Sequence, residues 1–143
     1  MRLGAHVSAA GGLSKAVDRA QFMGAETFQI FASSPRAWAF KQPTEDDVLA
    51  FHNNLEISDI SPVFLHGSYL VNVGGTTDLV EKSVSSLTDH MNVAGKIGAA
   101  GVIFHAGSHK GVGFEAVLGQ AASALKQVLL QSPSDVWLII ENS

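Results

Sequence analysis

The sequence contains no cysteine. Disulfide bonds and thiolate metal sites are therefore both excluded. Apolar runs are short and interrupted by glycine or charge, and none approaches the roughly 20 residues that a membrane-spanning helix needs. The first residues, Met1 to His6, contain no long apolar stretch of the kind found in a secretory signal. We therefore expect a cytoplasmic protein that does not bind a membrane.

Positive charge is also scarce. The chain has 9 lysines and arginines against 13 acidic residues, which gives a formal net charge of −4. This balance argues against a surface that binds nucleic acid by bulk electrostatic attraction. The net charge does not exclude a local basic loop, although no block of like charge stands out in the sequence.

The pattern along the chain predicts strands alternating with helices. Short apolar, β-branched runs predict strands at 3–7, 27–31, 63–66, 101–105 and 136–141. Apolar residues at helical spacing predict helices between them, at about 13–23, 44–55, 77–97 and 114–128. We expect Ser8 or Ser14 to cap the first helix, and Thr44 with Asp47 to begin the second in a weak capping box.

This alternation is typical of a parallel α/β protein, and we expect one domain over residues 1–143. Two folds fit the pattern. A flavodoxin-like doubly wound sheet also has five strands and suits the length of 143 residues. A (β/α)8 TIM barrel typically needs about 250 residues, so this chain would then be its N-terminal portion, with about five strands and four helices.

Metal-capable side chains stand at the ends of four predicted strands, namely His6, His66, His105 and Glu141. In either fold the carboxyl ends of the strands meet at one edge of the sheet. A single histidine in such a place is more often a packed side chain hydrogen-bonded to backbone, and we interpret His6 in that way. Three matching groups are harder to explain by packing, so His66, His105 and Glu141 predict a site.

Two histidines and a glutamate suit zinc, manganese or iron(II), and residue type alone does not choose among them. Three protein ligands leave room for a water molecule, which zinc can activate at neutral pH. The strand that ends in Glu141 is otherwise apolar, and an unpaired buried carboxylate there would be costly. A nearby cation would remove that cost.

Five motifs together resemble the endonuclease IV family of zinc-dependent apurinic/apyrimidinic endonucleases. They occur in the family's order and spacing along essentially the whole chain. The motifs are Gly4–Leu13 (GAHVSAAGGL), Pro35–Trp38 (PRAW), His66–Asn72 (HGSYLVN), Phe104–His109 (FHAGSH) and Ile140–Ser143 (IENS).

The resemblance implies a TIM barrel with up to three zinc ions at the carboxyl ends of its strands. Such hydrolases act in DNA repair and cleave the phosphodiester 5′ to an abasic site in double-stranded DNA. His66 and His105 match terminal ligands of one zinc. Glu141 matches the catalytic carboxylate, which is shared with a second zinc and holds the attacking hydroxide.

The resemblance also implies three DNA-binding residues. Arg36 matches an arginine that enters the duplex at the lesion, and Tyr69 and Leu70 match residues that press on the flanking bases. This is physically reasonable, because flipping a sugar that lacks its base costs less than flipping a paired nucleotide. We expect Trp38 to anchor its loop, and His52, His90 and His109 to be structural or surface residues.

The sequence departs from the family pattern in three places. Ala106 replaces a usual proline, Ser33 and Ser34 stand where other polar residues are common, and the remaining zinc ligands of the family are absent. We therefore expect the N-terminal portion of a DNA-repair barrel, with fewer zinc ions and little or no cleavage by this segment alone.

Two alternatives remain. One is a metal-dependent sugar isomerase or epimerase barrel, which would act on free ketoses. The other is a non-catalytic half-barrel assembly module that closes by homodimerisation. For the complete protein we expect no obligate protein partner, and self-association of the 143-residue chain remains open.

Overall fold

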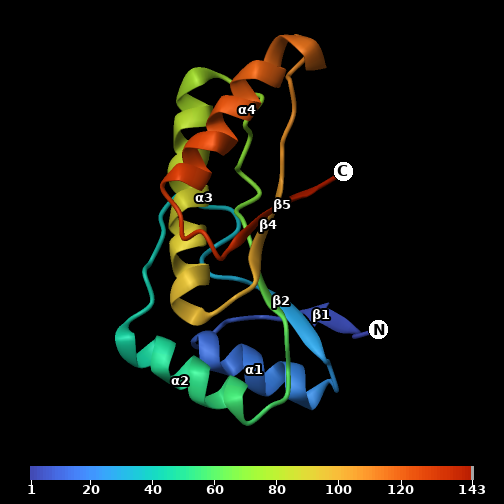
Figure 1. Cartoon of the computed structure of the whole chain (residues 1–143), viewed down its shortest axis with the longest axis vertical. Helices are drawn as coiled ribbons and strands as arrows, with labels where there is room; N and C mark the ends of the chain where they lie inside the picture. Colours follow the sequence, from blue (N-terminus) through green and yellow to red (C-terminus); the bar gives the residue numbers. More distant parts are fainter. Residues whose placement is uncertain (143) are drawn as a thin grey trace.

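The computed structural model describes residues 1–142 of the chain and shows nine alternating strands and helices. Figure 1 shows the helices to the left of and below the strands. The strands are β1 (Gly4–His6), β2 (Thr27–Phe31), β3 (Val63–His66), β4 (Gly101–His105) and β5 (Trp137–Glu141). The helices are α1 (Leu13–Phe22), α2 (Glu45–Glu56), α3 (Thr77–Ile97) and α4 (Phe114–Leu130). The predicted alternation is confirmed, with small shifts at the ends of the first and last strands.

The five strands form one parallel sheet in the order β1-β2-β3-β4-β5. A flavodoxin-like sheet has the order 2-1-3-4-5 instead. Sequential order is that of a barrel, in which each strand pairs with the next one along the chain. The sheet order therefore confirms the N-terminal portion of a (β/α)8 barrel and excludes the doubly wound alternative.

The start of α1 differs from the prediction. Its N-cap is Gly12, with φ 120°, and no side chain caps the helix. The hydroxyl of Ser8 accepts from the backbone N–H of Ala10 at 3.2 Å, so it stabilises the preceding loop. Arg19 also donates to the carbonyls of Ser8 and Ala10, at 2.6 and 2.7 Å. The Ser8 hydroxyl therefore bonds within the loop before α1 and does not cap the helix, so the predicted cap is wrong.

Helix α2 begins with a complete capping box. The Thr44 hydroxyl accepts from the backbone N–H of Asp47, and the Asp47 carboxylate accepts from the backbone N–H of Thr44. The carboxylate of Asp47 accepts from the backbone N–H of Thr44 and also from its hydroxyl, and these two bonds, the backbone one first, hold the pKa of Asp47 below its usual value. The predicted capping box is therefore confirmed, and it is stronger than the sequence suggested.

The core lies between the sheet and the helices. Alternate residues of the central strands and one face of α3 are buried there, and among the largest are Phe28, Ile30, Leu65, Leu87, Met91 and Phe104. Burial of a side chain of this size stabilises the fold by roughly 1.5–3 kcal/mol. This packing fixes the strands against α3 and so fixes where their carboxyl ends lie. In residues 1–142, no helix is both long and apolar enough to span a bilayer.

Candidate metal centre

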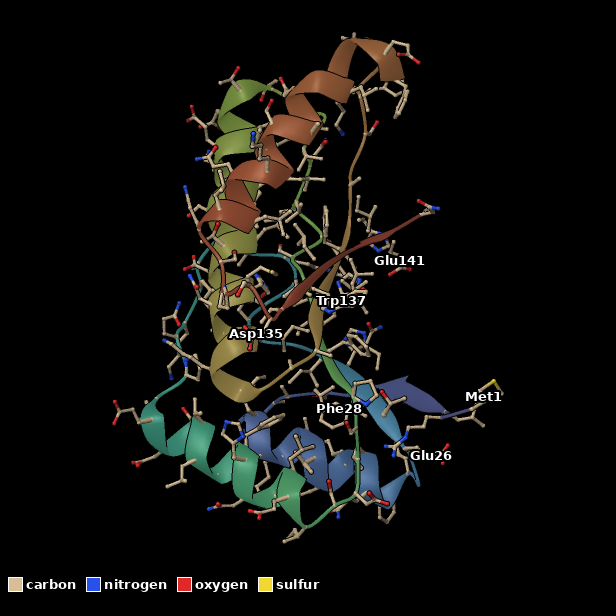
Figure 2. The ribbon with its side chains drawn as sticks, viewed as in Figure 1. Met1, Glu26, Phe28, Asp135, Trp137 and Glu141 are labelled. Atoms are coloured by element: carbon tan, nitrogen blue, oxygen red, sulfur yellow. The ribbon has the colours of Figure 1, made fainter. Side chains whose placement is uncertain are left out.

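Three neighbouring strands end in the three predicted ligands. His66, His105 and Glu141 are the last residues of β3, β4 and β5, and His105 pairs directly with Glu141 in the sheet register. Figure 2 shows Glu141 at the far end of β5 from Trp137. One ligand atom from each residue lies within 4.8 Å of the other two. The structure therefore brings together the group that the strand ends predicted.

The ring of His66 is fixed in a ligand-like orientation. The residue is 3% exposed, and Nδ1 lies 2.8 Å from the carbonyl oxygen of Gly67. A carbonyl only accepts, so Nδ1 carries the proton and the lone pair of the neutral ring is on Nε2. That Nε2 lies 3.5 Å from Oε2 of Glu141, whose side chain is half-exposed. Such an arrangement is common for metal-binding histidines, where the second nitrogen donates to a carbonyl.

His105 completes the group from the adjacent strand. Its ring centroid lies 5.3 Å from that of His66. Its Nδ1 is buried and has no hydrogen-bond partner within residues 1–142. A buried nitrogen without a partner is costly, and coordination of a cation by this ring is one way to offset that cost. The two histidines and Glu141 together form a donor set that fits zinc.

Tyr69 is the predicted DNA-binding residue that the structure places directly against this group. Its ring stacks on His105 with centroids 6.0 Å apart and meets the edge of His66 at 5.6 Å. The side chain is nevertheless 53% exposed, so its outer face is open to a ligand. Tyr69 therefore lies at the edge of the candidate site, and its role in binding DNA stays a prediction.

Arg36 and Leu70 lie on the loops that follow β2 and β3, and neither belongs to the group of three ligands. The carbonyl of Pro35 accepts from the backbone N–H of Tyr69 at 2.9 Å and from the Ser68 hydroxyl at 3.0 Å. These bonds tie the segment that carries Arg36, which is exposed, to the loop after β3. Leu70 lies in that loop and is partly buried.

Asn72 is a positioning residue that sequence reasoning did not single out, although it closes one of the motifs. Its side-chain oxygen accepts from the backbone N–H groups of Gly74, at 3.0 Å, and Ser108, at 3.1 Å. The N–H of Val73 also donates to the carbonyl of Ala106 at 3.0 Å. These bonds join the loop after β3 to the loop after β4, and so brace the ends of the strands that carry His66 and His105.

His6 lies beside the group but is not part of it. Its ring packs on Phe31 at 4.5 Å and is 6.0 Å from the ring of His66. Desolvation lowers the pKa of His6 first, and the neighbouring His66 lowers it further. Among residues 1–142, the metal-capable group consists of His66, His105 and Glu141 and does not include His6. The ring is packed on Phe31, and its expected hydrogen bond to the backbone stays a prediction.

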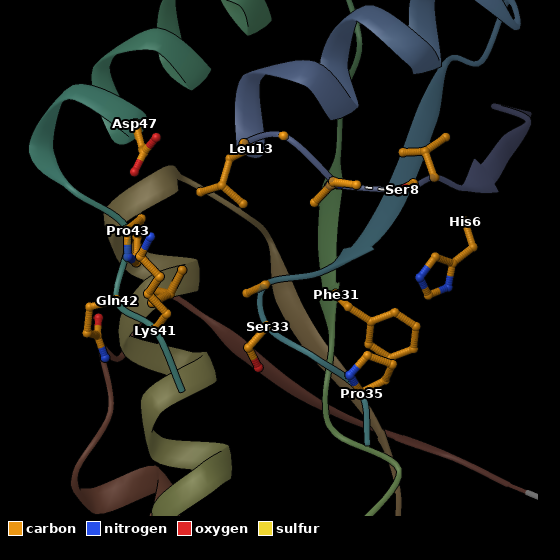
Figure 3. Close-up of a pocket in the computed structure, with 17 residues that line it drawn as sticks. His6, Ser8, Leu13, Phe31, Ser33, Pro35, Lys41, Gln42, Pro43 and Asp47 are labelled. Atoms are coloured by element: carbon orange, nitrogen blue, oxygen red, sulfur yellow. Dashed lines mark hydrogen bonds between the residues drawn. The ribbon is translucent and has the colours of Figure 1, made fainter. Parts of the chain in front are cut away.

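A pocket of about 820 Å³ opens next to His6. Its walls are the loop between β1 and α1 and the loop between β2 and α2, residues 32–44, which we call the β2–α2 loop. Figure 3 shows His6, Phe31 and Pro35 at one end, with Lys41, Gln42 and Asp47 at the other. The pocket therefore lies at the carboxyl ends of β1 and β2, on the side of the sheet away from β5.

The fold and the site agree with comparisons to known proteins. The chain belongs to the family described as xylose isomerase-like TIM barrel, which it matches over residues 17–143. Similar sequences indicate a narrower group. The chain is 36% identical to the "Probable endonuclease 4" of Halothermothrix orenii, over 99% of this chain and 51% of that protein. It is also 38% identical to the protein of the same name from Halobacterium salinarum, with equal coverage. The resemblance to the endonuclease IV family is therefore confirmed.

Solved structures give the same result. The crystal structure of endonuclease IV from Thermus thermophilus matches with a TM-score of 0.90 and 36% identity, over 100% of this chain and 52% of that chain. A D-tagatose 3-epimerase-like protein matches with a TM-score of 0.70 at 12% identity, which is a likeness of fold alone. The chain spans about half the length of the curated relatives that it matches.

Proposed function

We propose that this chain carries part of the active site of a DNA-repair endonuclease, which hydrolyses the phosphodiester 5′ to abasic sites in double-stranded DNA. The observation that carries the proposal is the convergence of His66, His105 and Glu141 within 4.8 Å, with the exposed ring of Tyr69 stacked on one of them. The similarity to proteins named endonuclease 4 supports the substrate.

The three residues fit a zinc ion on chemical grounds. His66 presents Nε2 while its Nδ1 donates to a carbonyl, His105 has a buried nitrogen without a partner, and Glu141 supplies a carboxylate. When bound, zinc would supply a Lewis acid for the phosphate and lower the pKa of a water molecule to about 7. The described residues offer one such set of three ligands, so we propose fewer ions here than the three that the family resemblance implies.

Four residues of the chain would orient the water and bind the DNA. The side chain of Glu141 is half-exposed, so its second carboxylate oxygen can accept a hydrogen bond from a water molecule and orient that water toward the phosphorus. Tyr69 offers an aromatic face on which a base beside the lesion can stack. Arg36 supplies positive charge on an exposed loop, and Leu70 adds apolar surface to the same edge. Together these groups would hold a duplex opened at the missing base.

The proposal is tested by the ligand preference of the purified chain in the presence of zinc. Fluorescence anisotropy should show tighter binding to a duplex that contains a stable abasic analogue than to the same duplex without a lesion. Equal binding to the two duplexes, together with turnover of free ketoses, would contradict the proposal and favour a sugar epimerase. Omitting zinc should remove the preference if His66, His105 and Glu141 hold the metal.

A further inference from the structure

His90 is a buried histidine that the proposed site does not use. It lies on α3 and is 1% exposed. Its Nδ1 is 2.7 Å from the carbonyl oxygen of Ser86, one helical turn earlier, so Nδ1 carries the proton of the neutral ring. Its Nε2 is buried and has no hydrogen-bond partner within residues 1–142. A second proton, on Nε2, would therefore find no acceptor while the ring stays packed.

The β2–α2 loop covers this ring. Phe40 meets His90 edge to face, with centroids 4.7 Å apart, and packs against the core. Next to it, the Gln42 amide donates to Asp89 at 3.4 Å and accepts from Lys96 at 3.5 Å. The C-terminal part of the loop thus rests on α3 around His90.

The loop has few other fixed points. Among the described residues, segment 32–43 makes two hydrogen bonds between backbone groups: the N–H of Ala37 donates to the carbonyl of Ser34 in a turn, and the carbonyl of Pro35 accepts from Tyr69. Its N-terminal part is held beside the candidate metal centre by Pro35. Its C-terminal part is held by the contacts of Phe40 and Gln42 with α3 and by the capping box at Thr44. Arg36 and Trp38 lie between these anchors. The same loop forms one wall of the pocket in Figure 3.

The surroundings of His90, taken together, favour its neutral ring. Burial is the main cause that lowers its pKa, and His66 on β3 lowers it further. The Ser86 carbonyl and Asp89, both on α3, act in the opposite direction without cancelling the effect. From the loop, the facing group is the uncharged ring of Phe40. A histidine exposed to water takes up a proton near pH 6.5, so acid below that value favours any state in which His90 is uncovered.

We propose that His90 and Phe40 form an acid-sensitive latch that holds the β2–α2 loop in place, and with it Arg36. At neutral pH the imidazole is neutral and the latch is closed. As the pH falls below the ordinary histidine range, protonation of the imidazole separates Phe40 from α3 and releases the loop. His90 and Phe40 are positioning residues; only what Arg36 does at the site rests on the proposed function.

Trp38 provides a direct readout, because the chain has two tryptophans and the other is Trp137. In a Trp137→Phe background, the emission and acrylamide quenching of Trp38 should change in one transition between pH 7.5 and 5. His90→Gln, which cannot titrate, should abolish the transition. The control is His52→Gln, because His52 also bonds a backbone carbonyl, that of Lys96 at 3.0 Å, and lies on α2. This variant should keep the transition.

A second variant approaches the latch from the loop. Phe40→Ala should give the released Trp38 signal already at pH 7.5 and show no further change on acidification. An unchanged transition in either His90→Gln or Phe40→Ala, or no transition in the parent chain, would overturn the latch. Circular dichroism at each pH would separate loop release from general unfolding.

The two proposals can fail separately. The Trp38 titration needs no DNA, so equal binding to abasic and intact duplexes would contradict the proposed function and leave the latch standing. If both hold, affinity for abasic duplex should fall on acidification more steeply in the parent chain than in His90→Gln. The extra loss of affinity in the parent chain should reach up to about tenfold for each unit by which burial lowers the pKa of His90. His66 and His105 are present in both chains, so the comparison isolates His90.

Discussion

Gly107 and Asn72 show how single residues hold the edge that carries the candidate metal centre. Gly107 has φ +88° and lies two residues after His105, where a Cβ atom would come within 2.5 Å of the Asn72 side chain. Glycine is therefore required here for two reasons, a left-handed backbone and close packing. The glycine allows Asn72 to accept from Ser108 and join the two loops.

We expect Gly107→Ala to destabilise the protein more than Gly111→Ala. Gly111 has nearly the same φ, +90°, but among residues 1–142, apart from its two chain neighbours, no atom lies within 4 Å of the site of its Cβ atom. Gly111→Ala should cost about 1 kcal/mol from backbone strain alone. Gly107→Ala adds overpacking of roughly 1–3 kcal/mol. Urea denaturation of both variants measures the difference, and equal losses would show that the contact with Asn72 is unimportant.

Tyr69 links the metal-capable group to the proposed DNA surface. Tyr69→Ala should weaken binding to abasic duplex by roughly 1–3 kcal/mol, the usual loss when an aromatic ring stacked on a base is removed. Tyr69→Phe keeps the ring that stacks on His105 and should retain most of the affinity. Anisotropy titrations give both values. Equal weakening in the two variants would indicate that the hydroxyl, and not stacking, carries the interaction.

The candidate ligands could be found from the sequence because each ends a predicted strand of a parallel sheet. His66, His105 and Glu141 needed only the strand pattern, and the structure places them together. Asn72 and His90 could not be assigned in this way, since their roles depend on contacts with Ser108 and Phe40, which are far away along the chain. No periodic pattern in the sequence indicates which distant residues Asn72 and His90 contact.

At the scale of elements, the helix starts differ in how firmly the local sequence defines them. Thr44 and Asp47 form a local box whose partners are three residues apart, so the sequence predicts it directly. The start of α1 was mispredicted because the hydroxyl of Ser8 is used by the preceding loop. Helix α3 ends as predicted near Gly98, which has a left-handed backbone at φ 67°.

Thr44→Ala should destabilise the protein by about 1 kcal/mol, the usual cost of losing a side-chain N-cap. Thr76 provides a matched control: it is the N-cap of α3, but its side chain makes no capping hydrogen bond. Thr76→Ala should therefore cost less. Urea denaturation at neutral pH compares the two, and a larger loss for Thr76→Ala would contradict this account of the helix starts.

The loss of unfolding free energy caused by Thr44→Ala should also depend on pH. The pKa of Asp47 is lowered in the folded chain, so its contribution to stability is present above the ordinary aspartate range and is lost as the pH falls through the folded value. The difference in unfolding free energy between the parent chain and Thr44→Ala should therefore narrow on acidification. A difference that grows at low pH would be inconsistent with a charged Asp47 in the capping box.

At the scale of the whole molecule, the sheet has two outer strands, β1 and β5, each paired on one side within residues 1–142. The start of β5 exposes Trp137, and α4 exposes Phe114 and Leu130. Strand edges of this kind tend to pair with other chains.

The length of the chain and the alternation of its predicted strands and helices could not decide between a doubly wound sheet and part of a barrel. The order of the strands did so, because it depends on contacts between distant segments.

We expect the 143-residue chain to incise abasic duplex DNA weakly or not at all, because the described residues offer one group of three metal ligands. A gel assay with zinc, using an end-labelled abasic duplex, measures this. Efficient zinc-dependent incision by the isolated chain would contradict the expectation. Light scattering on the same sample would reveal whether the chain pairs with itself, and incision confined to a dimer would favour a site completed by a second copy.

Zinc binding tests the central claim, that His66, His105 and Glu141 form one metal centre, most directly. Equilibrium dialysis should show one tightly bound zinc ion per parent chain. His105→Ala should weaken that binding by more than about 100-fold, since loss of an outer contact alone costs roughly 10–100-fold. His52→Ala, which removes a histidine outside the group, should leave it unchanged. Equal zinc affinity in the parent chain and His105→Ala would contradict the account.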